Sequence, residues 1–319
     1  MHHLTYRPAI SSPRLAQLTA HLTYSCAMAT TTELPPALWR KLFLEHVQAM
    51  ATPEFTLSTA RKISTASSSG SEYWPRARTC VFRGMFASLP VNPKNEAELN
   101  PEKYESDCLT LTTDCRMDKM AELVGADPAD ELDEDKKKNL KLSRRGALVE
   151  AAFWAKEKGT QWRVRGRAYV LGPDIEAPDA AAAKVVVDDL LSKMRSKQQS
   201  SASEKEDWSF SREVTAHFGN LSPLMRGSFR NPPPGTPVAV PVTDDRLKLG
   251  QKVTDLEDEV ARANFRVVVI VPLEVDQTDL SNPERGRRWQ YTFRRDGGKE
   301  PKAPGGVVED GWEKVEVWP

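Results

Sequence analysis

The chain has 319 residues, in which 45 lysines and arginines balance 45 aspartates and glutamates, and 39% of the residues are hydrophobic. This composition is sufficient to bury a core, and a net charge of zero gives no overall attraction to nucleic acid or to an anionic membrane surface. The longest apolar run, residues 267–271, has the length of a core strand and is too short to span a membrane.

The cysteines indicate the compartment of the protein, and the chain length limits the number of domains. None of the four cysteines forms a C-x2-C pair (Cys26, Cys80, Cys108 and Cys115), so a zinc site is not indicated, and a chain of this size does not need disulfides. We therefore expect a reducing compartment, the cytoplasm, and no bound metal. The length allows two domains of roughly 150 residues each, or one β-rich domain with insertions.

The first 34 residues are expected to lie outside the folded domain, as a disordered or wrongly assigned extension. Residues 1–32 contain Arg7 and Arg14 but no acidic residue, which weakly resembles a mitochondrial presequence. Met28 is a second plausible start of translation. A mitochondrial location is therefore the alternative to the cytoplasm if residues 1–27 act as a presequence.

Residues 75–84 read as a short β-strand with an arginine towards each end. Alternation along the strand gives two faces, with Arg78, Cys80 and Phe82 on one and Thr79, Val81 and Arg83 on the other. A guanidinium can bind a phosphate through two hydrogen bonds, and the backbone of a strand can contact the edge of a flat heterocycle. The alternative is a surface strand with solvated arginines.

Residues 108–114 and 117–123 form a strand-to-helix corner, with Asp118 near the start of the helix. Such a corner offers free backbone N–H groups, the hydroxyls of Thr112 and Thr113, and the ammonium of Lys119. Together these groups can hold a phosphate, although the same pattern also occurs in ordinary turns.

Residues 161–170 predict a strand that follows a turn at Gly159 and Thr160, because apolar and polar residues alternate cleanly along it. The polar face contains Gln161, Arg163, Arg165, Arg167 and Tyr169. Three arginines on one face imply an anionic ligand, an acidic neighbouring element, or solvent.

The remaining pattern predicts a helix over residues 37–50, with Trp39, Leu42, Phe43, Val47 and Met50 on its buried stripe, and helices over 179–199, 211–218, 221–229 and 254–263. Further strands are expected at 55–64, directly after Gly84, and at 148–154, 288–293 and 312–319. Residues 265–275 are continuously apolar, as in a strand buried on both faces. Six to eight strands with a few helices favour a β-rich α+β fold, a β-barrel with attached helices, over a doubly wound sheet.

We expect residues 35–319 to form a single domain that carries insertions near residues 125–146, 179–207 and 240–253. The first of these runs from acidic to basic residues and reads as a solvated insertion. The segment 92–107 is expected to be a surface loop.

In their order along the chain, these motifs resemble the FMN-binding split-barrel family typified by pyridoxamine-phosphate oxidase. Residues 78–83 resemble its flavin strand R-x-V-L-L-K, and residues 112–119 its phosphate corner Y-T-N-x-x-S-R-K. Residues 161–166 are similar to R-Q-V-R-V-x-G, residues 287–291 to D-R-F-x-Y, and residues 312–319 to W-x-x-x-R-L-x-P, with Glu316 in place of arginine. The resemblance covers residues 36–319 and implies a split β-barrel that binds FMN.

The resemblance also implies roles for individual residues. Arg78 and Lys119 would clamp the flavin phosphate with the help of Thr113, Gln161 would bond the polar edge of the isoalloxazine, and Arg288 would approach its pyrimidine side. Thr79, Val81, Arg83 and Thr112 complete the predicted cofactor site. Since the family's cofactor lies between two subunits, a homodimer is implied.

The chain also departs from this family. Two positions at which the oxidase has its R-x-H substrate pair are occupied by Glu284 and Gly286. We therefore expect an FMN-dependent oxidoreductase of unknown substrate, reduced by a nicotinamide nucleotide or by the substrate itself, with no nucleic-acid or membrane partner. Pyridoxamine-phosphate oxidase activity and a non-catalytic module that binds or stores flavin are the alternatives. An open pocket lined by Arg83, Arg226 and Tyr291 would favour catalysis.

Overall fold

The computed structural model describes residues 35–63, 72–125, 142–197 and 207–319. The extension predicted at residues 1–34, most of the insertion predicted at 125–146 and residues 198–206 of the insertion predicted at 179–207 lie outside the described residues. The boundaries of the domain and its insertions stay predictions. None of the helices in the described part of the chain is long and apolar enough to cross a membrane.

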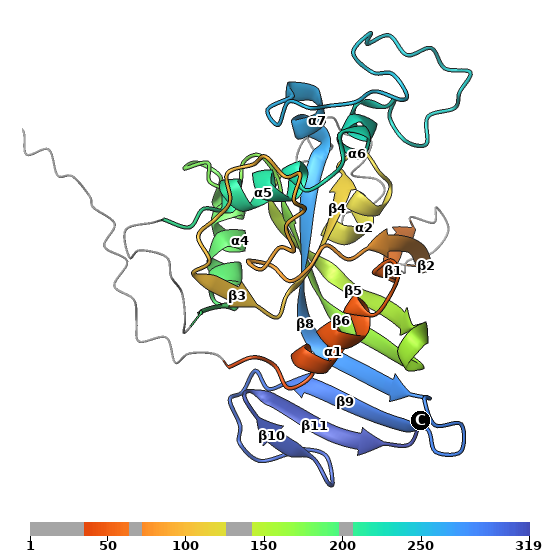
Figure 1. Ribbon diagram of the computed structural model, residues 1–319, viewed down its shortest axis with the longest axis vertical. Coiled ribbons are helices and arrows are strands. Elements are labelled where there is room, and N and C mark those ends of the chain that lie inside the picture. Colours follow the sequence, from red (N-terminus) through yellow and green to blue (C-terminus); the bar gives the residue numbers. More distant parts are fainter. Residues whose placement is uncertain (1–34, 64–71, 126–141, 198–206) are drawn as a thin grey trace, which may run out of the picture. The chain divides into compact units, whose positions relative to one another are not determined.

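The fold is dominated by one large antiparallel sheet (Figure 1). Its strands follow the order β10-β11-β9-β8-β6-β5-β1-β2, and β4 pairs with β8 off this path. The strands of the sheet are β1 (Glu54–Ile63), β2 (Glu72–Val81), β4 (Leu109–Asp114), β5 (Arg144–Ala155), β6 (Thr160–Leu171), β8 (Phe265–Asp279), β9 (Arg287–Phe293), β10 (Val307–Glu309) and β11 (Trp312–Val317). A separate two-stranded sheet pairs β3 (Tyr104–Ser106) with β7 (Met194–Ser196).

Six of these strands close into a barrel. The backbone N–H of Arg83, just beyond β2, donates to the carbonyl oxygen of Thr110 in β4 (2.9 Å), and the N–H of Thr110 donates to the carbonyl oxygen of Gly84 (3.0 Å). These bonds connect β2 to β4, and the ring continues through β8, β6, β5 and β1. The β-rich α+β fold expected from the sequence is therefore confirmed.

Strand β8 belongs to the barrel and also extends beyond it. Its first half pairs with β4 and its second half with β9, while β6 runs along its other edge throughout. The pairing of β6 with β8 is interrupted by a bulge, because Gly166 pairs with Pro272 and Arg165 with Glu274. A Cβ at Gly166 would lie 2.3 Å from the carbonyl oxygen of Val271, so only glycine allows this approach.

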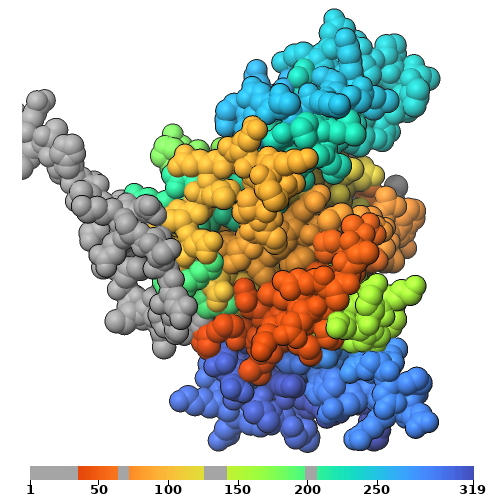
Figure 2. Space-filling model, in the orientation of Figure 1, coloured from red at the N-terminus to blue at the C-terminus, as the bar shows by residue number. Residues whose placement is uncertain are grey.

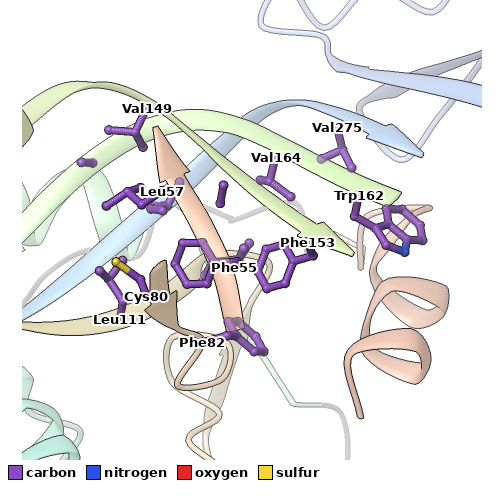
Figure 3. Packing of buried hydrophobic residues seen from close by; sticks show 14 of the residues in the cluster. Phe55, Leu57, Cys80, Phe82, Leu111, Val149, Phe153, Trp162, Val164 and Val275 are labelled. Atoms are coloured by element: carbon purple, nitrogen blue, oxygen red, sulfur yellow. The ribbon is translucent and has the colours of Figure 1, made fainter. Parts of the chain in front are cut away.

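The barrel interior is filled by aromatic side chains (Figure 3). Phe153 stacks on Phe55 with ring centroids 4.8 Å apart and makes edge contacts with Phe43 (5.1 Å) and Phe82 (5.9 Å). Phe43 comes from α1 (Arg40–Gln48), which covers one opening of the barrel. Residues of β8 alternate between this interior and a second core under α4 (Ala181–Leu191) and α5 (Phe210–Gly219), as expected for a strand buried on both faces.

Several predicted boundaries were wrong. The first helix begins at Arg40, and Leu42 on its expected stripe is exposed. No strand follows Gly84, where only isolated bridges of Met85 occur. The other helices are α2 (Lys119–Val124), α6 (Pro223–Gly227) and α7 (Glu259–Asn264), with 3-10 turns at Lys156–Lys158 and Ser228–Arg230. The helices predicted over 179–199 and 254–263 are thus shorter than expected, and the strand predicted at 148–154 begins earlier, at Arg144.

The aromatic packing predicts a large effect of Phe153→Ala. Removing this fully buried ring leaves a cavity among three other rings, so the free energy of unfolding should fall by about 3–5 kcal/mol. Urea denaturation followed by circular dichroism measures the change. Trp154→Ala, next in sequence but half exposed on the other face, is the control and should cost less than about 1 kcal/mol. Equal losses in both variants would contradict the assignment of this face to the core.

Candidate functional site

A cleft of about 620 Å³ opens where β2, β4 and the start of α2 face α6 and the loop that follows it. Its volume lies within the range of small-molecule sites, roughly 300–1,000 Å³. The structure brings six of the predicted cofactor residues together along one wall of this cleft: Thr79, Val81, Arg83, Thr112, Thr113 and Lys119.

The local structure explains why these residues meet. Thr79 and Val81 lie two residues apart in β2 and so share one face of the strand. Arg83 follows directly, held by its backbone bond to Thr110, while Thr112 and Thr113 stand at the end of β4. The chain then turns from β4 into α2, which begins at Lys119. The strand-to-helix corner predicted from the sequence is therefore present.

Two cations in this wall lack an anionic partner among the described residues. Burial lowers the pKa of Arg83, and its Nε atom is buried without a hydrogen-bond partner. Burial also lowers the pKa of Lys119, and this effect outweighs the opposing charges of Asp114 and Glu122, neither of which forms an ion pair with it. Desolvated cations next to hydroxyl groups are suited to bind an anionic group.

Arg78 points to the other side of β2, into the end of the barrel. Its guanidinium forms an ion pair with the fully buried carboxylate of Glu122 in α2 and donates to the hydroxyl of Thr59 (2.6 Å). Arg78 lines a shallow neighbouring pocket, to which Met117 and Lys119 also contribute. Arg78 therefore lies close to the corner, but its charge is already balanced by Glu122.

Gln161 and Arg288 lie elsewhere, on the outer face of the sheet. Both are directly opposite Thr278 of β8, Gln161 on the β6 side and Arg288 on the β9 side, so the three form one row. Neither lines the cleft. Arg288 forms an ion pair with Asp276 (2.7 Å), and although burial alone would raise the pKa of Asp276, its hydrogen bonds from Arg288 and Gln290 lower it.

The arginines on the polar face of β6 form ion pairs mainly with acidic residues of the neighbouring strands. Arg163 and Arg165 both bond Glu150 of β5 at 2.8 Å, and Arg165 also reaches Glu274 of β8 at 2.7 Å. Hydrogen bonds from Arg163, together with those from Arg165, lower the pKa of Glu150. Of the three alternatives raised by the sequence, the acidic neighbouring element is thus correct for these two arginines.

The pocket anticipated between Arg83, Arg226 and Tyr291 is not formed. Arg226 is buried and donates to the carbonyl oxygen of Val253 (2.9 Å). The Tyr291 ring belongs to the barrel core, and its hydroxyl bonds Gln277. Only Arg83 of the three faces the cleft.

The opposite wall of the cleft is apolar and was not predicted. It is formed by α6, by Phe229, and by a loop that extends beyond α6 and α7 (Figures 1 and 2). The loop contributes Pro232, Pro233, Pro234, Pro237, Val238, Val240, Val242 and Leu249. The sequence signal was its high content of proline and valine, which was interpreted only in part, as an insertion near residues 240–253.

Both ends of this loop are fixed to the body of the domain. Arg116, paired with Asp114, donates to the carbonyl oxygens of Asn231 (2.9 Å) and Phe229 (3.1 Å). The N–H of Lys248 donates to the carbonyl oxygen of Arg230 (3.0 Å). The apolar wall is therefore held at its base by the same β4–α2 corner that presents the hydroxyls and Lys119.

Together, the closed antiparallel barrel and the cleft lined by Arg83 and Lys119 at its rim define a β-barrel protein with a cationic cleft. Residues 36–172 match the family model of the pyridoxamine 5'-phosphate oxidase, FMN-binding domain. This match confirms the resemblance found in the sequence over that part of the chain. No curated protein matches the chain by sequence.

Two solved structures are similar to the chain in fold. One is a pyridoxamine 5'-phosphate oxidase-related, FMN-binding protein from Nostoc punctiforme, with 17% identity and a TM-score of 0.46 over 89% of this chain and 100% of that one. The other is PhzG from Burkholderia lata in complex with tetrahydrophenazine-1-carboxylic acid, with 13% identity and a TM-score of 0.37 over 88% of this chain and 90% of that one. The resemblance to the family rests on the match of residues 36–172 and not on these structures.

The pairing of Arg78 with Glu122 predicts a coupled effect on stability. Glu122→Ala should lower the free energy of unfolding by about 2–3 kcal/mol, less than for a fully buried pair because Arg78 is partly exposed. Adding Arg78→Leu to Glu122→Ala should recover part of this loss, since no unpaired charge then remains. Denaturant titration of both single variants and the double variant measures the coupling. Strictly additive losses would contradict the ion pair.

Proposed function

We propose that the chain binds FMN in this cleft, with the phosphate at the corner between β4 and α2. The observation that carries the proposal is the pair of desolvated cations, Lys119 and Arg83, which face a cleft of suitable volume and have no anionic partner among the described residues. A phosphate would supply the missing counter-charge. The match of residues 36–172 to the FMN-binding domain family supports FMN as the cofactor.

Each residue of the cleft has a distinct role in this proposal. Lys119 binds the phosphate as a point charge, and the hydroxyls of Thr112 and Thr113 add hydrogen bonds. Thr79 and Val81 pair with β1 alone, and closure onto β4 uses residues 83 and 84, so the other backbone edge of β2 is available to a flat ring system. Arg83 contributes a second positive charge further along the cleft. Arg78 acts indirectly, by holding β2 against α2, because its charge is already paired with Glu122.

The proposed site requires a second copy of the chain. Gln161 and Arg288 share one row on the outer face and do not reach the cleft of their own chain. In a homodimer with twofold symmetry, this row of one subunit would complete the cleft of the other, which gives two equivalent sites. The alternating charges of the outer face, from Glu150 through Arg163 to Asp276, suit a self-complementary interface.

When bound, FMN supplies one- or two-electron transfer, and the chain would then act as an FMN-dependent oxidoreductase. The apolar wall of residues 232–249 provides a surface for an apolar substrate. Pyridoxamine-phosphate oxidation is less well supported, because Glu284 and Gly286 lie in the turn between β8 and β9 and provide no R-x-H pair. A non-catalytic flavin-binding module is the second candidate, and turnover of the purified protein with NADPH distinguishes it from an enzyme.

Flavin binding should depend most strongly on Lys119. Lys119→Ala removes a charge-assisted bond to the phosphate and should weaken FMN binding at least about tenfold, measured by quenching of flavin fluorescence. Arg78→Ala should weaken it less, while also destabilising the fold, because Glu122 loses its closer cationic partner and keeps only Arg76 at 3.5 Å. Lys184→Ala on the exposed side of α4 is the control. Wild-type affinity in Lys119→Ala would rule out the proposed phosphate position.

A site shared between subunits can be tested by mixing two defective chains. Lys119→Ala and Arg288→Ala should each lose flavin as homodimers. After co-expression with random pairing, half of the dimers are mixed and each mixed dimer has one intact site, so about one quarter of the wild-type occupancy should return. Flavin absorbance per chain measures the occupancy.

Arg287→Ala is the matched control for the second variant, because Arg287 is adjacent in β9 but pairs with Glu316. It should bind flavin normally. If co-expression restores no flavin although each variant folds, the two halves of the site do not come from different chains, and the shared site is refuted.

A further inference from the structure

A second cavity, of about 280 Å³, lies on the far side of β6 and β8 from the barrel interior. It is enclosed by β6, the middle of β8, the segment after α4, and the β9–β11 extension. None of its lining residues also lines the cleft proposed for FMN. The cavity is therefore separate from the cofactor site.

Positive charge dominates this cavity. Five cations line it (Arg145, Arg167, Lys193, Arg195 and Arg295), against three carboxylates (Asp107, Asp189 and Asp310). Two of the carboxylates are already engaged. Asp107 makes two bonds of 2.9 Å with the buried guanidinium of Arg195, and Asp189 accepts a hydrogen bond from the Tyr169 hydroxyl (2.9 Å) and lies 3.6 Å from Arg145.

Three of the cations remain without a carboxylate partner in the described part of the chain. Arg167 donates to the carbonyl oxygen of Gly146 (2.8 Å), and Lys193 lies 5.3 Å from the centre of the Phe293 ring. No interaction of Arg295 with a carboxylate occurs within this part of the chain. The charge of these side chains is thus available to a ligand at the cavity wall.

The floor of the cavity is apolar and is shaped by the bulge in β8. Leu273 is the extra residue of the bulge, since its neighbours Pro272 and Glu274 pair with Gly166 and Arg165. Bulges redirect side chains, and Leu273 lines the cavity together with Val271, Phe293 and Trp312. Aromatic and aliphatic surface next to unpaired cations is suited to a ligand with a ring and an anionic group.

We propose that this cavity is a second ligand site, which binds a small ring compound carrying a carboxylate or a phosphate. Its volume, near the lower limit of roughly 300 Å³ for small-molecule pockets, restricts the ligand to about one ring. Pro35 lines the cavity, but the preceding residues 1–34 contain Arg7 and Arg14 and a single acid, Glu33. That segment does not complement the cationic wall, whereas a small anion does.

The test is calorimetric titration of the full chain, with its flavin, using benzoate, phenyl phosphate and benzyl alcohol. At least one of the two anions should bind, and benzyl alcohol, which keeps the ring but not the charge, should bind at least about tenfold more weakly. The stronger of the two anions identifies carboxylate or phosphate as the preferred group. Absence of binding by both anions, or equal binding of benzyl alcohol, would overturn the proposal.

Variants locate the binding. Lys193→Met and Arg167→Met should each weaken the anion about tenfold, whereas Lys184→Met, exposed on α4 and outside the cavity, should not. Lys119→Ala should lose flavin and keep the anion affinity, so that failure of the flavin site and failure of this site are distinguishable. Loss of anion binding in Lys119→Ala, or unchanged binding in both cavity variants, would place the anion elsewhere and refute the second site.

Discussion

The closure of the barrel by the backbone of residues 83 and 84 is the constraint on which the site depends. The paired bonds to Thr110 fix the chain directly after β2 against β4. These bonds also place Arg83 along the cleft wall. Without them, its guanidinium would be free to reach solvent. The Thr110 hydroxyl adds a third bond to the carbonyl oxygen of Gly84 (2.7 Å). Gly84 has a φ of 108°, which a side chain would disfavour, so the closure needs glycine at this position.

The buried carboxylate of Glu122 organises the other end of the same wall. It lies in a helix otherwise packed by apolar residues, and a charge there is costly without a partner. Arg78 supplies that partner across the barrel end, so β2 and α2 are held together by charge as well as by packing. Lys119, one turn earlier in α2, is partly desolvated and forms no ion pair within the described residues, which leaves its ammonium available to an anion.

The elements with strong periodicity were predictable from the sequence, and the pairings across long chain separations were not. The clean alternation of β6 and the unbroken apolar run of β8 follow directly from their half-buried and fully buried faces. Strands β3, β7 and β10 have three residues each, too few to show a period. The contact between Arg78 and Glu122 joins positions 44 residues apart, and no local pattern encodes it.

The location of Gln161 and Arg288 also follows from the topology. Up to the bulge opposite Gly166, β8 is curved into the barrel, and beyond the bulge it leaves the barrel and pairs with β9. Residues of the extension that point away from the barrel core must therefore face outwards, in the row that contains Gln161, Thr278 and Arg288. No rotation of these side chains brings them to a cleft built from β2, β4 and α2. A site that used all of the predicted residues would therefore need a second chain, as we propose, and the bulge in β8 is the feature that keeps the two groups of residues apart within one chain.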